Sequence, residues 1–578
     1  MSHLVGRTRK ITSVDADQLT TDDDKASTAG GAALLRHSVL GIRVPTLRAF
    51  VLHTSTIPLL ALAVVVAIRR SDGIDDAYIS YRYAENLSSG RGLVFNAGDR
   101  VEGVSNLLWT LLLAGVHALG VPIPTAATIL GVIGLAATVV LTRRVARRLR
   151  LPPLAATAAA GGVAVTTDLV SSATMGLEGG LFSALLLATV LTWGRLGWHE
   201  LFFAIAVASL AATRPEGILL GAILALSSIL ATSKLAQTTP YQRLRAPAAA
   251  LFGIALLEVW RFHYYGELVP MSVTAKRDIG SSPVASLLRH GPAGARYVVV
   301  RVGLPLFVAV VIILGTSASS GWRQWSNSAM RPKALGGVSN ATLLPAILLV
   351  ATGLVLPIMS GGDWMPFSRL ISPYFPLMYV LLAAAALSVG SRGALAASVV
   401  LPVAMAAAGH HGPALRDGRG NPLDTDSSFS VVGSALQESA LDGRVVATEV
   451  LGHVSFAAPD VRFTDVFGLT DPVVARTPGD GSPFGKKNYR YTQSLKPAAF
   501  MTNSWKAVPE FLSRGGSNAV SYVAVTSAQL NRNRVFLLID PAVAGRFSRV
   551  LASHDLGLEI VPPGVALARW RQLYPDGQ

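Results

Sequence analysis

Residues 123–150 read IPTAATILGVIGLAATVVLTRRVARRLR, an apolar run that ends in a cluster of arginines. About twenty mostly apolar residues form a helix long enough to cross the hydrocarbon core of a bilayer, and arginines beyond its end mark the cytoplasmic side. This stretch therefore predicts a membrane-spanning helix whose C-terminal end lies in the cytoplasm.

The composition of the whole chain agrees with a membrane protein. Its 578 residues are 51% hydrophobic and 15% charged, with a mean hydropathy of +0.46, whereas soluble domains carry about 25% charged residues. A formal net charge of +16 would suggest nucleic acid in a soluble protein, but in a membrane protein it indicates arginine-rich cytoplasmic loops, and we expect no nucleic-acid partner. The sequence has no cysteine, which excludes disulfides and thiolate nucleophiles.

Apolar runs predict about 11 transmembrane helices between residues 51 and 409. The tail at 1–50 mixes acids, Ser, Thr and Gly, so we expect it to be disordered and cytoplasmic. The first span, at 51–68, is then a retained helix. The remaining predicted spans lie at 123–142, 151–167, 180–194, 200–213, 216–232, 247–260, 297–315, 341–359, 370–388 and 394–409.

One shorter run, SNLLWTLLLAGVHAL at 105–119, has about fifteen residues, which is below spanning length, so we interpret it as an interfacial helix. If it crossed the bilayer, the arginines at 143–150 would lie on the same side as the loop after the first span. With the helix on the surface, the cytoplasmic loops carry arginines, lysines and a single acid, Glu200, whereas the opposite loops are acidic. This asymmetry predicts an active face outside the cytoplasm.

After residue 409 the pattern changes to short strand-like runs, such as RVVATEV, VSYVAVTS and VFLLID, between stretches rich in Gly, Pro and Asp. Residues 410–578 are therefore expected to form an α/β domain, with His410 and His411 as part of a linker. An odd number of spans from a cytoplasmic N-terminus places this domain in the periplasm. The sequence thus predicts a polytopic α-helical protein of the plasma membrane with a C-terminal periplasmic α/β domain.

Two adjacent aspartates lie near the start of the first external loop, at 69–122. Asp75 and Asp76 follow the first span by about seven residues, so their carboxylates are expected at the membrane surface. Repulsion between neighbouring carboxylates and partial burial raise a pKa, so one aspartate can accept a proton from a hydroxyl nucleophile while the other stays charged. The alternative is that Asp75 caps the N-terminus of a helix.

Several motifs resemble those of the GT-C glycosyltransferases, within a group that includes the actinobacterial terminal arabinofuranosyltransferases and many uncharacterised relatives, some of them flagellar-motor-associated. The first and longest motif, at 75–114, covers the aspartate pair and the interfacial helix. The others are SATMGLEGGLFSALLL, ATRPEGILL, YYGELVPMSVTAK, GGDWMPFSRLISPYFPL and FGLTDPVVAR. They occur in order over about four hundred residues, and the resemblance implies that residues 51–409 form a GT-C transmembrane domain.

The resemblance implies a lipid-linked donor. It predicts transfer of a sugar, D-arabinofuranose, from decaprenyl phosphate to a hydroxyl of cell-wall arabinan or lipoarabinomannan on the periplasmic side. In the family an acid of the first external loop takes the catalytic role, so we expect the base to be Asp75 or Asp76, with Asp75 preferred and the choice left open.

Beyond the base, the site needs cations for the leaving phosphate and polar or aromatic groups for the sugar. The candidate phosphate ligands are Arg214, Lys276, Arg277 and Arg369. The candidate sugar or acceptor ligands are Tyr78, Arg82, Glu102, Glu178, Glu216, Tyr265, Asp363 and Trp364.

These residues also have structural interpretations. The cations are equally compatible with side chains that reach toward lipid headgroups. Arg214 and Glu216 can form an ion pair within a turn, and Glu178 can stabilise a helix N-terminus. Gly361 and Gly362 allow either a close approach of the backbone to a sugar or phosphate, or a helix C-cap.

Two other functions are compatible with the same topology: a transporter or flippase for a lipid-linked sugar, and a non-catalytic envelope protein associated with the flagellar motor. The polar groups cluster in external loops rather than at mid-span, which favours a transferase. A divalent cation near the acidic loop is compatible with its acids, but no ligand-spacing motif requires it, and no other cofactor is indicated. The adjacent acids are compatible with inversion or retention at the anomeric carbon.

Overall fold

The computed structural model describes most of the chain from residue 73 onward, and all of this part belongs to one of two units, Leu52–Gln578. The described residues are 73–233, 239–275, 283–303, 340–363, 368–388, 394–408, 427–439, 441, 443–476, 489–502, 507–513, 522–526, 530, 535–553 and 559–573. The predicted tail at 1–50, the first span at 51–68, the histidine pair and most of the predicted span at 297–315 lie outside them.

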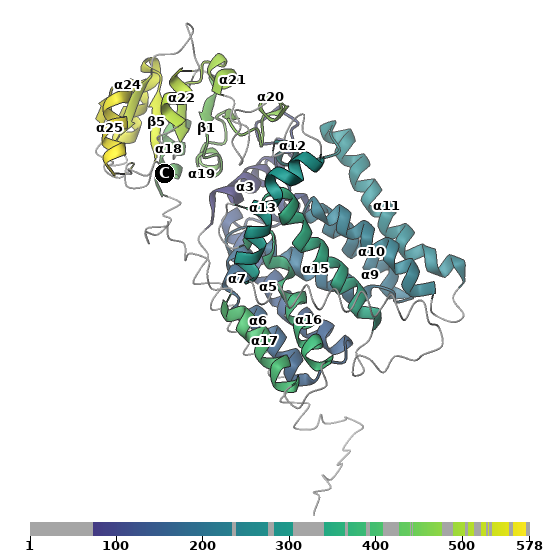
Figure 1. Ribbon diagram of the computed structural model, residues 1–578. Coiled ribbons are helices and arrows are strands. Elements are labelled where there is room, and N and C mark those ends of the chain that lie inside the picture. Colours follow the sequence, from purple (N-terminus) through teal and green to yellow (C-terminus); the bar gives the residue numbers. More distant parts are fainter. Residues whose placement is uncertain are drawn as a thin grey trace, which may run out of the picture. The chain divides into compact units, whose positions relative to one another are not determined.

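The first part of the described chain is helical (Figure 1). In chain order the elements are α3 (Asp75–Ser88), α4 (Leu107–His117), α5 (Ile123–Arg148), α6 (Pro153–Val165), α7 (Thr167–Thr174), α8 (Gly179–Thr192), α9 (Trp198–Thr213), α10 (Glu216–Ser233), α11 (Pro240–Tyr265), α12 (Met271–Ala275), α13 (Pro283–Val302), α15 (Asn340–Ser360), the 3-10 turn η2 (Ser372–Tyr374), α16 (Phe375–Ser388) and α17 (Ala394–Ala408).

Two of these helices, α5 and the stretch Leu343–Ser360 of α15, are long and apolar enough to cross a membrane. A third span results if α6 and α7, which bend by 56° at their break, are counted together. Other apolar helices, such as α8 and α9, have 10–17 residues. The chain is therefore a polytopic helical membrane protein, while the number of about 11 spans stays a prediction.

Helix α6 fills most of the predicted span at 151–167, and the break between α6 and α7 lies at the C-terminal end of this span. Helix α6 ends at Val165 because Thr166 is extended, with ψ 105°, and α7 starts again at Thr167. The Thr166 hydroxyl donates to the carbonyl oxygen of Gly162 at 2.6 Å and lies 2.5 Å from the Tyr379 hydroxyl. Such side-chain bonds to the preceding turn bend helices, and apolar length alone does not reveal them.

The predicted interfacial helix is present as α4. Its Trp109 and Leu113 are buried, and the Trp109 indole donates to the carbonyl oxygen of Gly176 at 2.9 Å. On its opposite side, Leu111 and Leu112 are exposed. A short helix with one packed face and one exposed apolar face has the form that a membrane-surface helix requires, and its location at the bilayer surface stays a prediction.

Helix α5 packs closely against α7 and α8 through glycines. A Cβ added at Gly131 would lie 1.7 Å from the carbonyl oxygen of Ala173 in α7. A Cβ at Gly134 would lie 2.8 Å from backbone atoms of Gly180 and Leu181 in α8. Small residues at both positions therefore let the helix backbones approach one another, as is common in membrane bundles.

The second part of the described chain is an α/β region. Its elements are α18 (Ser427–Glu438), β1 (Val446–Thr448), α19 (Gly452–Phe456), β2 (Phe463–Asp465), α20 (Pro472–Arg476), α21 (Tyr489–Ser494), β3 (Ala499–Thr502), α22 (Ala507–Ser513), β4 (Val523–Thr526), β5 (Phe536–Ile539), α24 (Pro541–Ala552), β6 (Glu559–Val561) and α25 (Pro563–Leu573). The strand order is β2-β1-β3-β5-β4-β6. β1 pairs in parallel with β2 and β3, and the other pairs are antiparallel.

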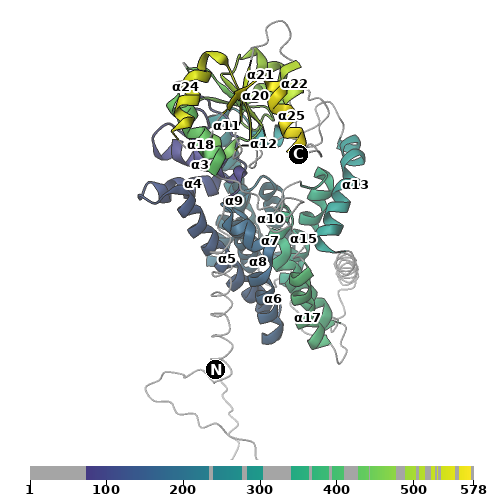
Figure 2. The same cartoon turned by 90° about the vertical axis from the view of Figure 1, so that its left-hand side faces the viewer.

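Helices cover both faces of this sheet, and Figure 2 shows α24 and α25 on opposite sides of the strands. Along β5, Leu537 packs in one hydrophobic cluster with Phe547 of α24, whereas Leu538 packs in another with Trp570 of α25. This alternation follows from the two-residue period of a strand. The predicted C-terminal α/β region is thus confirmed, while its start at residue 410 and its periplasmic location stay predictions.

The loop after α3 is docked on the α/β region. Tyr83 and Phe95 belong to the same buried hydrophobic cluster as Val454 and Phe463. The side-chain amide of Asn96 donates to the carbonyl oxygen of Phe463 at 2.9 Å and accepts from its N–H at 3.0 Å. Apolar burial and paired hydrogen bonds therefore join α3 and its loop to the α/β region.

We expect Gly131→Ala to lower the melting temperature, because the new methyl group forces α5 and α7 apart at a cost of about 1–3 kcal/mol. The matched control is Gly115→Ala in α4, where an added Cβ meets nothing within 4 Å and helix propensity improves. Thermal denaturation of both variants in one detergent tests this. Equal melting temperatures would contradict the tight helix contact.

Candidate active site

The two aspartates of the first loop begin helix α3. The N-cap residue is Ile74, and no side-chain hydrogen bond caps this end. Asp75 is therefore the first helical residue and not the cap, so the capping alternative does not hold. Consecutive helical residues project about 100° apart, and the two carboxylates consequently face different partners.

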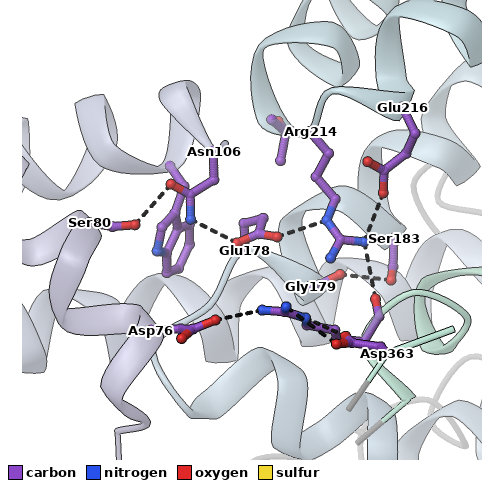
Figure 3. A network of polar contacts seen from close by, with 12 residues as sticks. Asp76, Ser80, Asn106, Glu178, Gly179, Ser183, Arg214, Glu216 and Asp363 are labelled. Carbon is purple, nitrogen blue, oxygen red and sulfur yellow. Dashed lines mark hydrogen bonds and ion pairs between the residues drawn. The ribbon is translucent and has the colours of Figure 1, made fainter. Parts of the chain in front are cut away.

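Asp76 faces an arginine from the segment between α15 and α16. Its Oδ2 accepts from Nη1 of Arg369 at 2.8 Å. The Nε of Arg369 donates to Asp363, and its Nη2 makes a longer contact of 3.4 Å with the other oxygen of that carboxylate. Arg369 therefore joins the two carboxylates, which are labelled Asp76 and Asp363 in Figure 3.

A second arginine, Arg214, lies directly beside the first. Its Nε donates to Glu178 at 2.8 Å, and its Nη1 lies 3.1 Å from Glu216. The same Nη1 donates to the backbone carbonyl oxygen of Arg369 at 3.1 Å. Arg214 and Glu216 thus form the ion pair expected within the turn, but Glu178 and the Arg369 carbonyl tie this pair into the network (Figure 3).

Two polar residues that the sequence analysis did not select extend the network to α4. The amide nitrogen of Asn106 donates to Oε2 of Glu178 at 2.9 Å, and its amide oxygen accepts from Ser80 at 2.9 Å. Ser80 lies one helical turn after Asp76 on α3. Asn106 directly precedes an apolar helix, and this signal could have marked it as a candidate.

The electrostatics keep both arginines charged. Burial alone would lower the pKa of Arg214, but Glu216 and Glu178 outweigh it, so the pKa is raised. The pKa of Arg369 is likewise raised, because Asp363 and Asp76 outweigh its burial. Both guanidinium groups are largely buried. The site therefore holds two permanent positive charges away from bulk water, where they interact strongly with anions.

The glycine pair at 361–362 closes α15. Gly361 and Gly362 have positive φ of 81° and 89°, and the N–H of Gly362 donates to the carbonyl oxygen of Pro357 at 2.8 Å. This is helix C-capping, as one of the two interpretations predicted. The turn places Asp363 where it binds Arg369.

Asp75 faces the α/β region instead. Its carboxylate accepts from the N–H groups of Gly452 and His453 and lies 3.1 Å from Nδ1 of His453. Burial alone would raise the pKa of Asp75, but these contacts from His453 and Gly452 together lower it below its usual value. Asp75 is therefore held as a carboxylate by the α/β region.

Arg82 and Tyr78, both candidates for sugar binding, also face the α/β region. The Arg82 guanidinium donates to five backbone carbonyl oxygens, which matches its five N–H groups. The ring of Tyr78 contacts that of His453, with centroids 3.8 Å apart and the ring planes tilted by 34°. The structure thus uses the Arg82 donors for docking, and neither residue is part of the Arg214–Arg369 network.

Glu102 and Tyr265 lie elsewhere. Glu102 forms a buried ion pair with Arg261 of α11 at 2.8 Å, and the Tyr265 hydroxyl donates to the carbonyl oxygen of Leu93 at 2.9 Å. Burial raises the pKa of Glu102 to about 7 and outweighs the attraction of Arg261. These contacts tie the first loop to the end of α11 and do not bring either residue to the network.

Three further candidates, Lys276, Arg277 and Trp364, lie outside the described residues. Within the described ranges, no group of three or more His, Asp or Glu side chains is arranged to hold a metal ion. The polar network combines segments that were predicted from the sequence to lie on one external face. Of the candidate residues chosen from the sequence, the network contains Asp76, Glu178, Arg214, Glu216, Asp363 and Arg369.

Comparison with known proteins gives matches over parts of the chain. Residues 422–536 match a family described as Domain of unknown function (DUF8728). The chain is 27% identical over 335 residues to the terminal beta-(1->2)-arabinofuranosyltransferase of Mycobacterium tuberculosis, covering 53% of this chain and 51% of that relative. The protein of the same name from Corynebacterium glutamicum is 27% identical over 343 residues, covering 53% of this chain and 46% of the relative.

The chain thus spans about half the length of the curated relatives it matches. Among solved structures, Archaeoglobus fulgidus oligosaccharyltransferase is similar with a TM-score of 0.45 and 10% identity, over 82% of this chain and 72% of that chain. ArnT from Cupriavidus metallidurans, bound to undecaprenyl phosphate, has a TM-score of 0.46 and 12% identity, over 85% and 98%. The two arabinofuranosyltransferase matches confirm the resemblance that the sequence motifs predict.

We expect Arg214→Met to lower the free energy of unfolding by about 3–5 kcal/mol, because Glu178 then stays buried without its cation. The double variant Arg214→Met/Glu178→Leu should recover part of this loss. The matched control is Arg476→Met, which breaks an exposed pair with Glu267 and should cost below about 1 kcal/mol. Denaturation in mild detergent measures all three, and a loss for Arg214→Met no larger than the control's would contradict a stabilising network.

The stability of the protein should fall as the pH rises from acidic to just above neutral, because of Glu102. Because its pKa is about 7 in the folded protein and 4.5 normally, its stabilising effect is complete below about pH 4.5 and is lost as the pH rises through 7. Between about pH 5.5 and pH 8 we expect a loss on the order of 2 kcal/mol. Melting curves of Glu102→Gln should show a flatter pH dependence, while exposed Glu267→Gln keeps the wild-type slope.

Proposed function

We propose that the protein is a membrane glycosyltransferase that moves a sugar from a polyprenyl phosphate to an acceptor hydroxyl on the non-cytoplasmic side. The observation that carries this proposal is a partly exposed carboxylate, Asp76, that pairs with the buried Arg369, while a second buried arginine, Arg214, lies beside Arg369 near the ends of apolar helices. Such a site combines a base for a hydroxyl with cations for a phosphate, within reach of a lipid.

Asp76, and not Asp75, is the base in this proposal. Both oxygens of Asp75 are occupied by hydrogen bonds from α19, and its lowered pKa makes it a weak base. Asp76 binds Arg369 through Oδ2 only, and among the contacts described for this part of the chain Oδ1 accepts no hydrogen bond. The side chains of Asp76 and Asp75 are equally exposed, at 31%, so the Oδ1 of Asp76, and not a difference in exposure, makes this carboxylate available to an incoming hydroxyl.

Arg369 and Arg214 are the proposed phosphate ligands. Arg369 lies next to the base, so a phosphate that it binds stands close to the acceptor hydroxyl. Nε and Nη1 of Arg214 contact Glu178, Glu216 and the carbonyl oxygen of Arg369. Nη2 makes no hydrogen bond with any residue that the structure describes. Guanidinium groups bind phosphate oxygens by two hydrogen bonds and gain most in surroundings of low dielectric constant.

The proposed reaction follows from this arrangement. The acceptor hydroxyl gives its proton to Asp76, and its oxygen forms a bond to the anomeric carbon of the donor sugar. The bond between that carbon and the phosphate oxygen breaks, and its electron pair leaves with the polyprenyl phosphate. The arginines stabilise the charge that develops on the phosphate, which lowers the barrier.

The sugar is inferred from the relatives, because two proteins named terminal beta-(1->2)-arabinofuranosyltransferase match half of this chain, which supports arabinofuranose. Decaprenyl phosphate as the lipid of the donor, and cell-wall arabinan or lipoarabinomannan as the acceptor, enter the proposal through the resemblance of the sequence motifs. In the proposed topology, the N-terminus is cytoplasmic and the α/β region is periplasmic. Glu178, Glu216 and Asp363 in this view orient the two arginines rather than bind the sugar directly.

We expect Asp76→Asn to lower kcat by about 100-fold or more, because a general base contributes about 10²–10⁴-fold to the rate and an amide cannot accept the proton. Transfer of labelled arabinose from synthetic decaprenyl phosphoryl arabinose to an arabinan oligosaccharide, in detergent, measures this. Full activity of a folded Asp76→Asn variant would show that another group is the base.

The matched control is Asp99→Asn in the same loop, which loses only an ion pair with Arg462 and should keep kcat within about twofold. A second assay follows labelled donor lipid across vesicle membranes without acceptor. Movement of lipid together with no sugar transfer would favour the transporter alternative and would refute the proposed function.

A further inference from the structure

Helix α19 of the α/β region lies against the first turn of α3. The N–H of Gly452 donates to Oδ2 of Asp75 at 3.0 Å, and the N–H of His453 donates to Oδ1 at 2.9 Å. A Cβ added at Gly452 would lie 1.7 Å from the backbone carbonyl oxygen of Asp75. Only glycine allows this approach, so Gly452 lets the start of α19 pack directly against the start of α3.

Arg82 binds the other end of α19. It follows Asp75 by seven residues, or two helical turns, and so lies on the same side of α3. Its Nη1 donates to the carbonyl oxygens of Ser455 and Ala458, the latter at 3.0 Å, and its Nη2 to that of Val461 at 2.7 Å. A carboxylate thus meets N–H groups at the start of α19, and a guanidinium meets one carbonyl group at its end and others in the segment that follows, the polarity that helix ends require.

The side chain of His453 adds to this contact. It is completely buried, its Nδ1 lies 3.1 Å from Oδ1 of Asp75, and its ring contacts that of Tyr78 of α3 at a tilt of 34°. The imidazole therefore touches two residues in the first turn of α3, on either side of Asp76 in the sequence. A carboxylate held by two backbone N–H groups and a buried imidazole has little freedom to move.

We propose that His453 is a positioning residue for sugar transfer, which acts through Asp75 to orient Asp76. The inference rests on the proposed function. Asp75 and Asp76 share one helical turn, so a rotation of this turn after loss of the His453 contact moves the Asp76 carboxylate relative to Arg369. Misplacement of a reacting group by about 1 Å can cost about 10²-fold in rate.

The test compares His453→Phe with His453→Asn in the full-length protein. Phenylalanine keeps a ring against Tyr78 but removes the nitrogen, whereas the amide nitrogen of asparagine can replace Nδ1 as a donor to Asp75. We expect His453→Phe to lower kcat about 10–100-fold with KM for decaprenyl phosphoryl arabinose within about twofold of wild type, and His453→Asn to stay within about threefold of the wild-type kcat.

The matched control is Asn96→Ala, which breaks two buried hydrogen bonds between the same loop and the α/β region without touching Asp75. It should lower the melting temperature and leave kcat within about twofold of wild type. An equal loss of kcat in Asn96→Ala and His453→Phe would mean that docking as a whole matters, and His453 would have no positioning role. The same conclusion follows if His453→Asn is as slow as His453→Phe.

A double-mutant cycle with Asp75→Asn tests the contact from its other side. If His453 acts through Asp75, each single variant and the double variant lose kcat to a similar extent, because the second change removes nothing more. Additive losses, or wild-type activity of either single variant, would overturn the inference, and Asp75→Asn provides this result even if His453→Phe fails to fold. Absence of transfer by the wild-type protein would instead refute the proposed function itself.

Discussion

Two buried guanidinium groups impose the constraint on which the site depends. Arginine stays charged in proteins, so a buried guanidinium must be surrounded by carboxylates and carbonyl oxygens. Arg369 meets Asp76 and Asp363, and Arg214 meets Glu178, Glu216 and the carbonyl oxygen of Arg369. These demands bring together α3, the ends of α8, α9 and α15, and the start of α10. The same charges that join the helix ends also suit the leaving phosphate of the proposed reaction.

Because consecutive residues of a helix project in different directions, the two neighbouring aspartates bind different partners. Asp75 is fixed by backbone N–H groups of α19, while Asp76 meets an arginine from the membrane part and keeps one oxygen accessible. Neighbouring carboxylates would repel each other if both faced one cavity, and separate partners remove much of that conflict. The first turn of α3 thus connects the α/β region to the polar network within two residues.

Docking of the first loop on the α/β region explains why several candidates are absent from the network. Arg82 is one of the candidate sugar or acceptor ligands in the first external loop. In the structure its donors satisfy carbonyl oxygens at the end of α19 and the following turn. Glu102 is another of these candidate ligands, yet it forms an ion pair with Arg261 at the end of α11. Buried charges need partners wherever they lie, so charge in a loop does not by itself mark a substrate site.

Local patterns in the sequence were enough to predict the apolar helices, the short helix α4, the C-terminal α/β region and most of the charged residues that meet in the network. These features follow from hydropathy, strand period and charge, which are local properties of the chain. The folded structure was needed to show that the chain bends at Thr166, that Asn106 and Ser80 join the network, and that His453, nearly four hundred residues away, contacts Asp75. These contacts join residues that are far apart along the chain, and no periodic pattern in a sequence indicates which distant residues will meet. Which aspartate keeps a free oxygen depends on packing between helices that the sequence does not encode locally.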